Sequence, residues 1–211
     1  MELSRPDALL RRIAQQLLPH FPGIFSMETV ERYVTESYES LARGARVRQH
    51  LFTLTHRLAE ARLTALAQSR GAIGKPVCEV LFVCTHNAGR SQMAAALMKH
   101  HAAGRVHVRT AGTHPAHEIE PTVIEALALM GVTTTTEFPK PLTDEIVLAA
   151  DVIVSMGCGD ACPVHPGKRY LNWDFSDTRG KSLHDVHNLC QMIDLMVRDL
   201  LDELIPHPAS Q

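Results

Sequence analysis

Strand-like and helix-like segments alternate through the last two thirds of the chain, and this alternation limits the fold more than any other feature. Short segments rich in branched or aromatic residues predict strands at 78–84, 106–113, 151–157 and 169–175. Segments with helical periodicity follow them, at 91–102, 121–131, 143–150 and about 182–205. Strands that alternate with helices form right-handed β-α-β units. We therefore expect an α/β fold, a small parallel sheet flanked by helices, in residues 78–211.

The first seventy residues have a different character. They contain ten arginines, seven acidic residues and no lysine, in three amphipathic helical segments. Pro6 suits the first turn of one helix, and Ser26 is suited to cap the next. We expect residues 1–70 to form an all-α three-helix bundle, joined to the α/β domain by the linker 71–77. The bundle contains no catalytic or metal-binding pattern, so its role stays open.

Composition excludes several classes of protein. The chain has 211 residues, of which 45% are hydrophobic, and its formal charge of −2 gives no reason to expect a nucleic-acid partner. No apolar run has the length of a membrane span, and the N-terminus lacks the pattern of a signal peptide. Five unevenly spaced cysteines do not make a secreted disulfide framework. We expect a cytoplasmic protein with no membrane partner, in which cysteines serve catalysis or redox chemistry.

Residues 84–91, CTHNAGRS, join the first predicted strand of the α/β domain to its first predicted helix. At such a junction, backbone N–H groups and the positive end of the helix dipole stabilise an anion or a thiolate. Cys84 is therefore a candidate nucleophile at an oxyanion site. Arg90 offers two parallel donors to an oxyanion, and Ser91 can hydrogen-bond the Cys84 sulfur. The expected oxyanion-binding residues are Thr85, His86, Asn87, Ala88, Gly89, Arg90 and Ser91.

The order of these residues resembles a known family. A cysteine, five residues and then Arg-Ser at the end of the first strand is similar to the low-molecular-weight tyrosine phosphatase superfamily. Gln92-Met93 directly after the serine resembles the arsenate reductases of that superfamily, since the phosphatases typically have proline where Gln92 stands. The bundle resembles a domain fused to such reductases in actinobacteria. The resemblance of the α/β domain covers about residues 78–205 and includes the segments 110–116, 150–163 and 173–177.

The resemblance implies a role for Asp177 as the general acid. Thr178 stands where the family usually has a proline after this aspartate. Tyrosine phosphatases also tend to have aromatic residues there that sandwich the substrate ring, whereas this chain has Thr178-Arg179-Gly180. Without such aromatic side chains, a phenyl ring gains little binding energy.

The resemblance also implies how the nucleophile is regenerated. Cys158 and Cys162, beyond the third predicted strand, fit the two resolving cysteines of thioredoxin-coupled reductases. Cys158 would attack Cys84 to release arsenite, and Cys162 would then form a disulfide that thioredoxin reduces. Another branch of the superfamily uses mycothiol with a mycoredoxin instead. Arsenate is the implied substrate, and neither a metal nor an organic cofactor is implied.

Two other functions stay open on the residues alone. A phosphatase that acts on phosphotyrosine or a small phosphoester would use Cys84, Arg90 and Asp177 without the later cysteines. An arsenite-binding sensor would use Cys84, Cys158 and Cys162, and it would not need the arginine or the aspartate. Turnover of arsenate would identify the reductase. Without such turnover, hydrolysis of a phosphoester would identify the phosphatase and tight binding of arsenite the sensor.

Other cysteines, histidines and methionines are expected to be structural. A zinc site at Cys158, Cys162 and His165 lacks a fourth ligand. Cys78 opens a buried strand, and Cys190 lies on the apolar stripe of the last helix. None of the thirteen histidines belongs to a zinc motif with a glutamate. In the last helix, the residues expected in the core are Met192, Ile193, Leu195, Met196 and Leu200.

Overall fold

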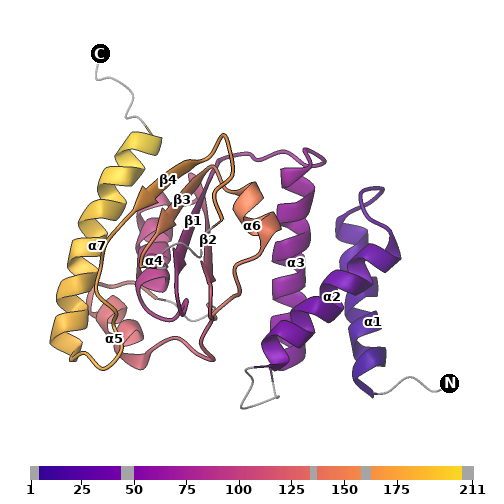
Figure 1. Ribbon diagram of the computed structural model, residues 1–211, viewed down its shortest axis with the longest axis horizontal. Coiled ribbons are helices and arrows are strands. Elements are labelled where there is room, and N and C mark those ends of the chain that lie inside the picture. The colour runs from indigo at the N-terminus through magenta and orange to yellow at the C-terminus, as the bar shows by residue number, and fades with distance from the viewer. Residues whose placement is uncertain (1–4, 44–49, 134–136, 158–162, 206–211) are drawn as a thin grey trace. The chain divides into compact units, whose positions relative to one another are not determined.

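The computed structural model describes residues 5–43, 50–133, 137–157 and 163–205. The chain divides into two compact units, Met1–Gly74 and Lys75–Gln211. Figure 1 shows the described part of the first unit as helices and that of the second as a sheet with helices. Cys158 and Cys162 lie outside the described residues, so their redox roles stay predictions.

The first unit consists of helices packed on one apolar core. Its described elements are α1 Arg5–Leu17, the 3-10 helix η1 Leu18–His20, α2 Met27–Ala42 and α3 Leu51–Ser69. Ser26 caps α2, because its side chain accepts a hydrogen bond from the Thr29 backbone N–H at 3.2 Å. The core includes the buried residues Leu10, Ile13, Leu17, Val30, Val34 and Leu63. The predicted all-α character of this part is confirmed.

The second unit contains a four-stranded parallel sheet in the order β2-β1-β3-β4. Its strands are β1 Cys78–Cys84, β2 Val106–Gly112, β3 Val152–Ser155 and β4 Arg169–Asn172. In the central strand β1, Cys84 is in register with Gly112 and Val83 with Ser155. Because parallel strands end at the same edge of a sheet, Cys84 stands at the carboxyl edge between two neighbours.

Helices flank the sheet (Figure 1). They are α4 Arg90–Ala102, α5 Pro121–Leu129, α6 Asp144–Ala149 and α7 Leu183–Leu204. Val80 and Phe82 of β1 share an apolar core with residues of α4, α5 and α7. The alternate residues Leu81 and Val83 are fully buried as well, and α6 contacts β1. Such burial of both faces is typical of a parallel sheet, and the predicted α/β fold class is confirmed.

The predicted helices and strands of the second unit are present, although their ends are shifted by a few residues. Two residues of the last helix were wrongly predicted to be buried. Gly131, at φ +76°, lies just beyond the end of α5, as expected for a glycine that terminates a helix. Met192 and Leu195 were expected in the core, but they are 50% and 65% exposed. They lie on the outer face of α7, because its buried stripe runs through Val186, Leu189, Cys190, Ile193, Val197, Leu200 and Leu201.

Two kinds of feature are absent from the described part of the chain. No helix there has the length and apolarity that crossing a membrane requires. No group of three or more histidine, cysteine, aspartate or glutamate side chains there is placed to hold a metal ion.

Candidate active site

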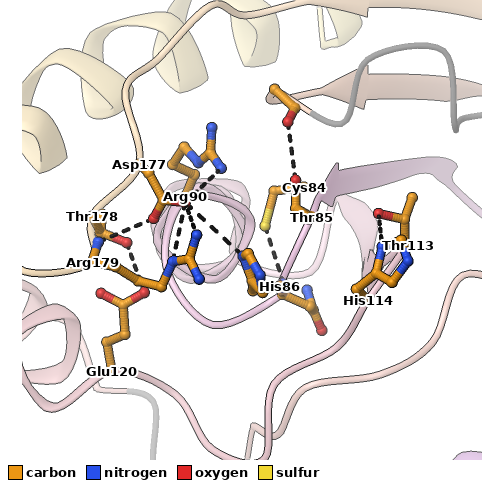
Figure 2. A network of polar contacts seen from close by, with 12 residues as sticks. Cys84, Thr85, His86, Arg90, Thr113, His114, Glu120, Asp177, Thr178 and Arg179 are labelled. Atoms are coloured by element: carbon orange, nitrogen blue, oxygen red, sulfur yellow. Dashed lines mark hydrogen bonds and ion pairs between the residues drawn. The ribbon is translucent and has the colours of Figure 1, made fainter.

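The loop between β1 and α4 surrounds the sulfur of Cys84 (Figure 2). Cys84 is only 2% exposed, and its Sγ accepts a hydrogen bond from the Asn87 backbone N–H at 3.2 Å. The Oγ atom of Ser91, in the first turn of α4, lies 2.9 Å from the same sulfur. The contact that the sequence predicted between Ser91 and Cys84 is therefore present.

Asn87 determines the direction of the hydrogen bond between Ser91 and Cys84. The Lys140 backbone N–H donates to Asn87 Oδ1 at 2.8 Å, which identifies that atom as the amide oxygen. The Nδ2 group therefore donates to Ser91 Oγ at 2.8 Å. Since the Ser91 oxygen accepts this bond, its own hydrogen is available to the Cys84 sulfur. The sulfur thus receives two hydrogen bonds, and such bonds are strongest to a thiolate.

The peptide groups of the loop are oriented by the segment 113–120, which follows β2. Backbone N–H groups of that segment donate, at 2.8 to 3.3 Å, to the carbonyls of Cys84, Thr85, His86 and Ala88. In a trans peptide, the N–H of the next residue points away from the carbonyl oxygen. The N–H groups of residues 85, 86, 87 and 89 consequently point away from the segment 113–120, and that of Asn87 meets the Cys84 sulfur. Successive backbone N–H groups that point the same way can bind an anion.

Arg90, at the start of α4, is buried and has contacts with two partly buried residues. Its Nη1 donates to the Phe175 carbonyl at 2.9 Å, and its Nη2 lies 3.7 Å from Asp177 Oδ2. Gly157, at φ +75°, leaves room for the guanidinium, because an added Cβ would lie 2.3 Å from Nη1. The buried planar cation can bind two oxygens of an oxyanion and neutralise their charge.

Asp177 lies among three side chains that can carry positive charge (Figure 2). Arg179 donates to its carboxylate through the backbone N–H at 3.0 Å and through Nη2 at 3.1 Å. His86 Nδ1 and Arg90 Nη2 lie 4.0 and 3.7 Å from Oδ2. Partial burial raises the pKa of Asp177, but the hydrogen bonds from Arg179 and the charge of Arg90 outweigh burial and hold this pKa below its ordinary value. Asp177 is therefore ionised at neutral pH in this state.

Two other described cysteines differ from Cys84 in their surroundings. Burial raises the pKa of the Cys190 thiol to about 12, with a smaller contribution from the charge of Asp194. Burial, and then the charge of Asp151, also raises the pKa of Cys78. Both thiols stay protonated at neutral pH, which makes them poor nucleophiles.

Two contacts of the site were not predicted. Glu120 Oε1 accepts a hydrogen bond from Thr178 Oγ1 at 2.9 Å, and the Lys140 backbone N–H binds Asn87 as described above. The partners are 58 and 53 positions apart in the chain. No local pattern marks Glu120 or Lys140, since these contacts exist only after the sheet has brought distant segments together.

Two family matches cover most of the chain. Residues 79–207 match the low molecular weight phosphotyrosine protein phosphatase family. Residues 10–67 match the N-terminal domain described as protein-tyrosine-phosphatase-like. The boundary between the two matches falls within residues 68–78.

Several proteins similar to this chain have names that refer to arsenate. A putative arsenate reductase of Halobacterium salinarum is 29% identical over 130 residues, 59% of this chain and 92% of the relative. Arsenate reductase 1 of Staphylococcus epidermidis is 32% identical over 106 residues, 48% of this chain and 79% of the relative.

Among solved structures, the thioredoxin-dependent arsenate reductase of Corynebacterium glutamicum is 45% identical, with a TM-score of 0.84. That match covers 93% of this chain and 96% of the other. An arsenate reductase in the phosphate binding state is 25% identical, with a TM-score of 0.53, and covers 61% of this chain and 100% of the other. On these similarities, the chain belongs to the low molecular weight phosphotyrosine protein phosphatase family, among its arsenate reductases.

Proposed function

We propose that this protein reduces arsenate to arsenite through the thiolate of Cys84, and that thioredoxin restores the reduced enzyme. The observation that carries the proposal is the 45% identity to the Corynebacterium glutamicum thioredoxin-dependent arsenate reductase over 93% of the chain. The site supports it, because the Cys84 sulfur lies in a loop of backbone donors with Arg90 beside it. Arsenate is a tetrahedral oxyanion of the kind that such donors stabilise.

The first step joins arsenate to the enzyme. The Cys84 thiolate attacks arsenic, an arsenic–oxygen bond breaks, and the departing oxygen takes a proton from Asp177 to leave as water. Asp177 is ionised in the free protein, but a bound arsenate anion shares Arg90 and adds negative charge nearby. Both effects raise the pKa of the Asp177 carboxyl, so it takes up a proton as the substrate binds.

The second step transfers two electrons to arsenic. Cys158 attacks the sulfur of Cys84, the sulfur–arsenic bond breaks, and its electron pair stays on arsenic, which leaves as arsenite. Cys162 then attacks Cys158, frees the Cys84 thiolate and leaves a disulfide that the two thiols of thioredoxin reduce. The position of Cys158 shortly after β3 supports this order, since β3 ends at the same edge of the sheet as Cys84. We place the reaction in the cytoplasm, where thioredoxin keeps thiols reduced.

The same proposal assigns the chemistry to one part of the chain. Residues 78–211 form the catalytic domain, residues 1–70 a separate three-helix domain, and residues 71–77 the linker. The division of the contacts between Gly74 and Lys75, and the separate family matches of 10–67 and 79–207, support these boundaries. All the proposed catalytic residues belong to the second domain.

The proposal is tested by arsenite release from arsenate, measured with the purified full chain, thioredoxin, thioredoxin reductase and NADPH. We expect turnover by the wild type and none by Cys84→Ser, Cys158→Ser or Cys162→Ser. Cys78→Ser is the matched control, because this thiol lies outside the proposed relay. It is expected to keep wild-type turnover.

Other outcomes favour other functions. If only Cys84→Ser is inactive and the wild type requires mycothiol with a mycoredoxin, the cysteine relay is wrong and the reductase survives. Hydrolysis of a phosphoester without arsenate reduction would identify a phosphatase. Tight binding of arsenite to Cys84, Cys158 and Cys162 without any turnover of arsenate would identify a sensor.

A further inference from the structure

Thr178, the residue directly after Asp177, is attached to a distant part of the chain. Its side chain is buried, with 1% of the residue exposed, and its Oγ1 donates a hydrogen bond to Glu120 Oε1 at 2.9 Å. Figure 2 shows this bond beside the cluster of Asp177, Arg179 and Arg90. A hydrogen bond from a buried threonine hydroxyl to a carboxylate restrains the backbone of the threonine.

Glu120 is in turn attached to the loop of the nucleophile. It directly precedes α5, and its backbone N–H donates to the Ala88 carbonyl at 3.1 Å. Thr178 also contacts this loop directly, since a Cβ added to Gly89 would lie 2.1 Å from Thr178 Oγ1. The absence of a side chain at Gly89 therefore lets the acid-bearing loop approach the loop of Cys84.

Asp177 itself has weak attachments to the rest of the fold. Its hydrogen bonds come from Arg179, which belongs to the same loop and moves with it. His86 and Arg90 lie 4.0 and 3.7 Å away, beyond hydrogen-bond distance. The backbone on either side of Asp177 is better held, by the bond from Arg90 to the Phe175 carbonyl and by the bond from Thr178 to Glu120.

We propose that Glu120 is a positioning residue of the reaction, which acts through the Thr178 hydroxyl to hold Asp177 at the mouth of the Cys84 loop. This inference rests on the proposed function, because it assigns Asp177 as the acid. A proline after the aspartate would restrain the loop by fixing φ. In this chain the hydrogen bond between Thr178 and Glu120 supplies the restraint instead, and Gly89 makes room for it.

The first test compares the rate of arsenate reduction in variants that break or keep the bond. Glu120→Ala and Thr178→Val remove it, and we expect kcat to fall roughly 10- to 100-fold, as for a misplaced catalytic group. The inhibition constant of inorganic phosphate should change little, because the loop N–H groups and Arg90 are intact. Glu120→Gln and Thr178→Ser keep the acceptor and the hydroxyl, and they should recover most of the loss.

A second comparison separates positioning from a general structural role. In an Asp177→Asn background, Glu120→Ala should cause no further loss of kcat, because the group that it positions is already gone. Glu118→Ala is the matched control, an exposed glutamate two residues earlier in the same segment. It should leave kcat unchanged. An equal loss in both backgrounds, or an unchanged kcat in Glu120→Ala, overturns the inference.

Hydrogen exchange distinguishes failure of this inference from failure of the proposed function. Peptides that span residues 174–181 should exchange faster in Glu120→Ala and Thr178→Val than in the wild type and Glu118→Ala. A wild type that reduces no arsenate contradicts the proposed function, and exchange alone then decides the inference. Faster exchange of this loop supports the attachment to Glu120, and unchanged exchange overturns it.

Discussion

The Oγ atom of Ser91 lies 2.9 Å from the sulfur of Cys84 and accepts a hydrogen bond from Asn87 Nδ2 at 2.8 Å. The Lys140 backbone N–H fixes the orientation of the Asn87 amide. The serine hydroxyl is therefore a donor to the sulfur. It is held in place by hydrogen bonds that run from the Lys140 backbone N–H through the Asn87 amide. A hydrogen bond to a charged acceptor contributes about 1.5–3 kcal/mol, which makes Ser91 a sensitive target for substitution.

Ser91→Ala should slow alkylation of Cys84 by iodoacetamide at pH 7 by about tenfold or more, because the thiolate loses one of its two donors. Mass spectrometry of the peptide that contains Cys84 separates this reaction from alkylation of other cysteines. Ser69→Ala, which removes a hydroxyl bound to the Leu66 carbonyl in the N-terminal unit, is the control. Equal rates in all three proteins would contradict the role of the serine.

Gly157→Ala should lower kcat/KM for arsenate by roughly 100-fold, because the new Cβ displaces Arg90 from its place beside Phe175 and Asp177. Gly167→Ala is a matched control. Gly167 also has a positive φ, +78°, but an added Cβ there meets nothing within 4 Å. Both variants should lose about 1–2 kcal/mol of stability through backbone strain, whereas only the first should lose activity. Similar kinetics for the two variants would show that Arg90 tolerates displacement.

Arg179→Leu should move the basic limb of the pH profile of kcat, which reports the enzyme–substrate complex, to higher pH. The side-chain hydrogen bonds and the charge of Arg179 help to lower the pKa of Asp177, so their loss raises it, although the bond from the residue 179 backbone N–H stays. A general acid with a raised pKa keeps its proton to higher pH. Lys181→Met is the control, since Lys181 contacts Ser176 and no bond joins it to Asp177 in the described part of the chain. A basic limb that stays in place in Arg179→Leu would argue against Asp177 as the acid.

Much of the site could be predicted because it is local in the sequence. Cys84, Arg90 and Ser91 lie within eight consecutive residues, at a junction of strand and helix whose geometry follows from the two elements themselves. The parallel sheet follows from the alternation of strands and helices, and it puts the end of β1 at an edge. The buried face of α7 was harder to predict, because apolar residues such as Met192 also lie on its exposed face.

The remaining parts of the site depend on contacts between distant residues. The direction of the Asn87 amide is determined by Lys140, 53 positions later, and nothing in CTHNAGRS specifies it. The partner of Thr178 is Glu120, 58 positions earlier. A sequence shows that proline is absent after Asp177, but only the packed structure shows what replaces it.

Glu79 and Arg109 form a buried ion pair between β1 and β2, with Glu79 Oε2 2.7 Å from Arg109 Nε and Glu79 Oε1 3.3 Å from His107 Nδ1. Burial raises the pKa of Glu79, but hydrogen bonds from His107 and Arg109 and the arginine charge outweigh it and lower this pKa to about 2. A carboxyl with a lowered pKa stabilises the folded state above its unfolded pKa, near 4.5, and this stabilisation disappears as pH falls through 2. The shift corresponds to about 3 kcal/mol.

The free energy of unfolding of the wild type should therefore fall between pH 5 and pH 2 by more than that of Glu79→Gln. Trp173, the single tryptophan, packs against Phe82 in the second unit, so its fluorescence during urea titration reports the unfolding of that unit. Glu79→Gln should also be less stable at pH 7, because it removes the carboxylate charge that pairs with the buried Arg109. Glu118→Gln, at an exposed position, should follow the wild type throughout. Parallel pH curves for the wild type and Glu79→Gln would show that Glu79 does not make the folded state sensitive to acid.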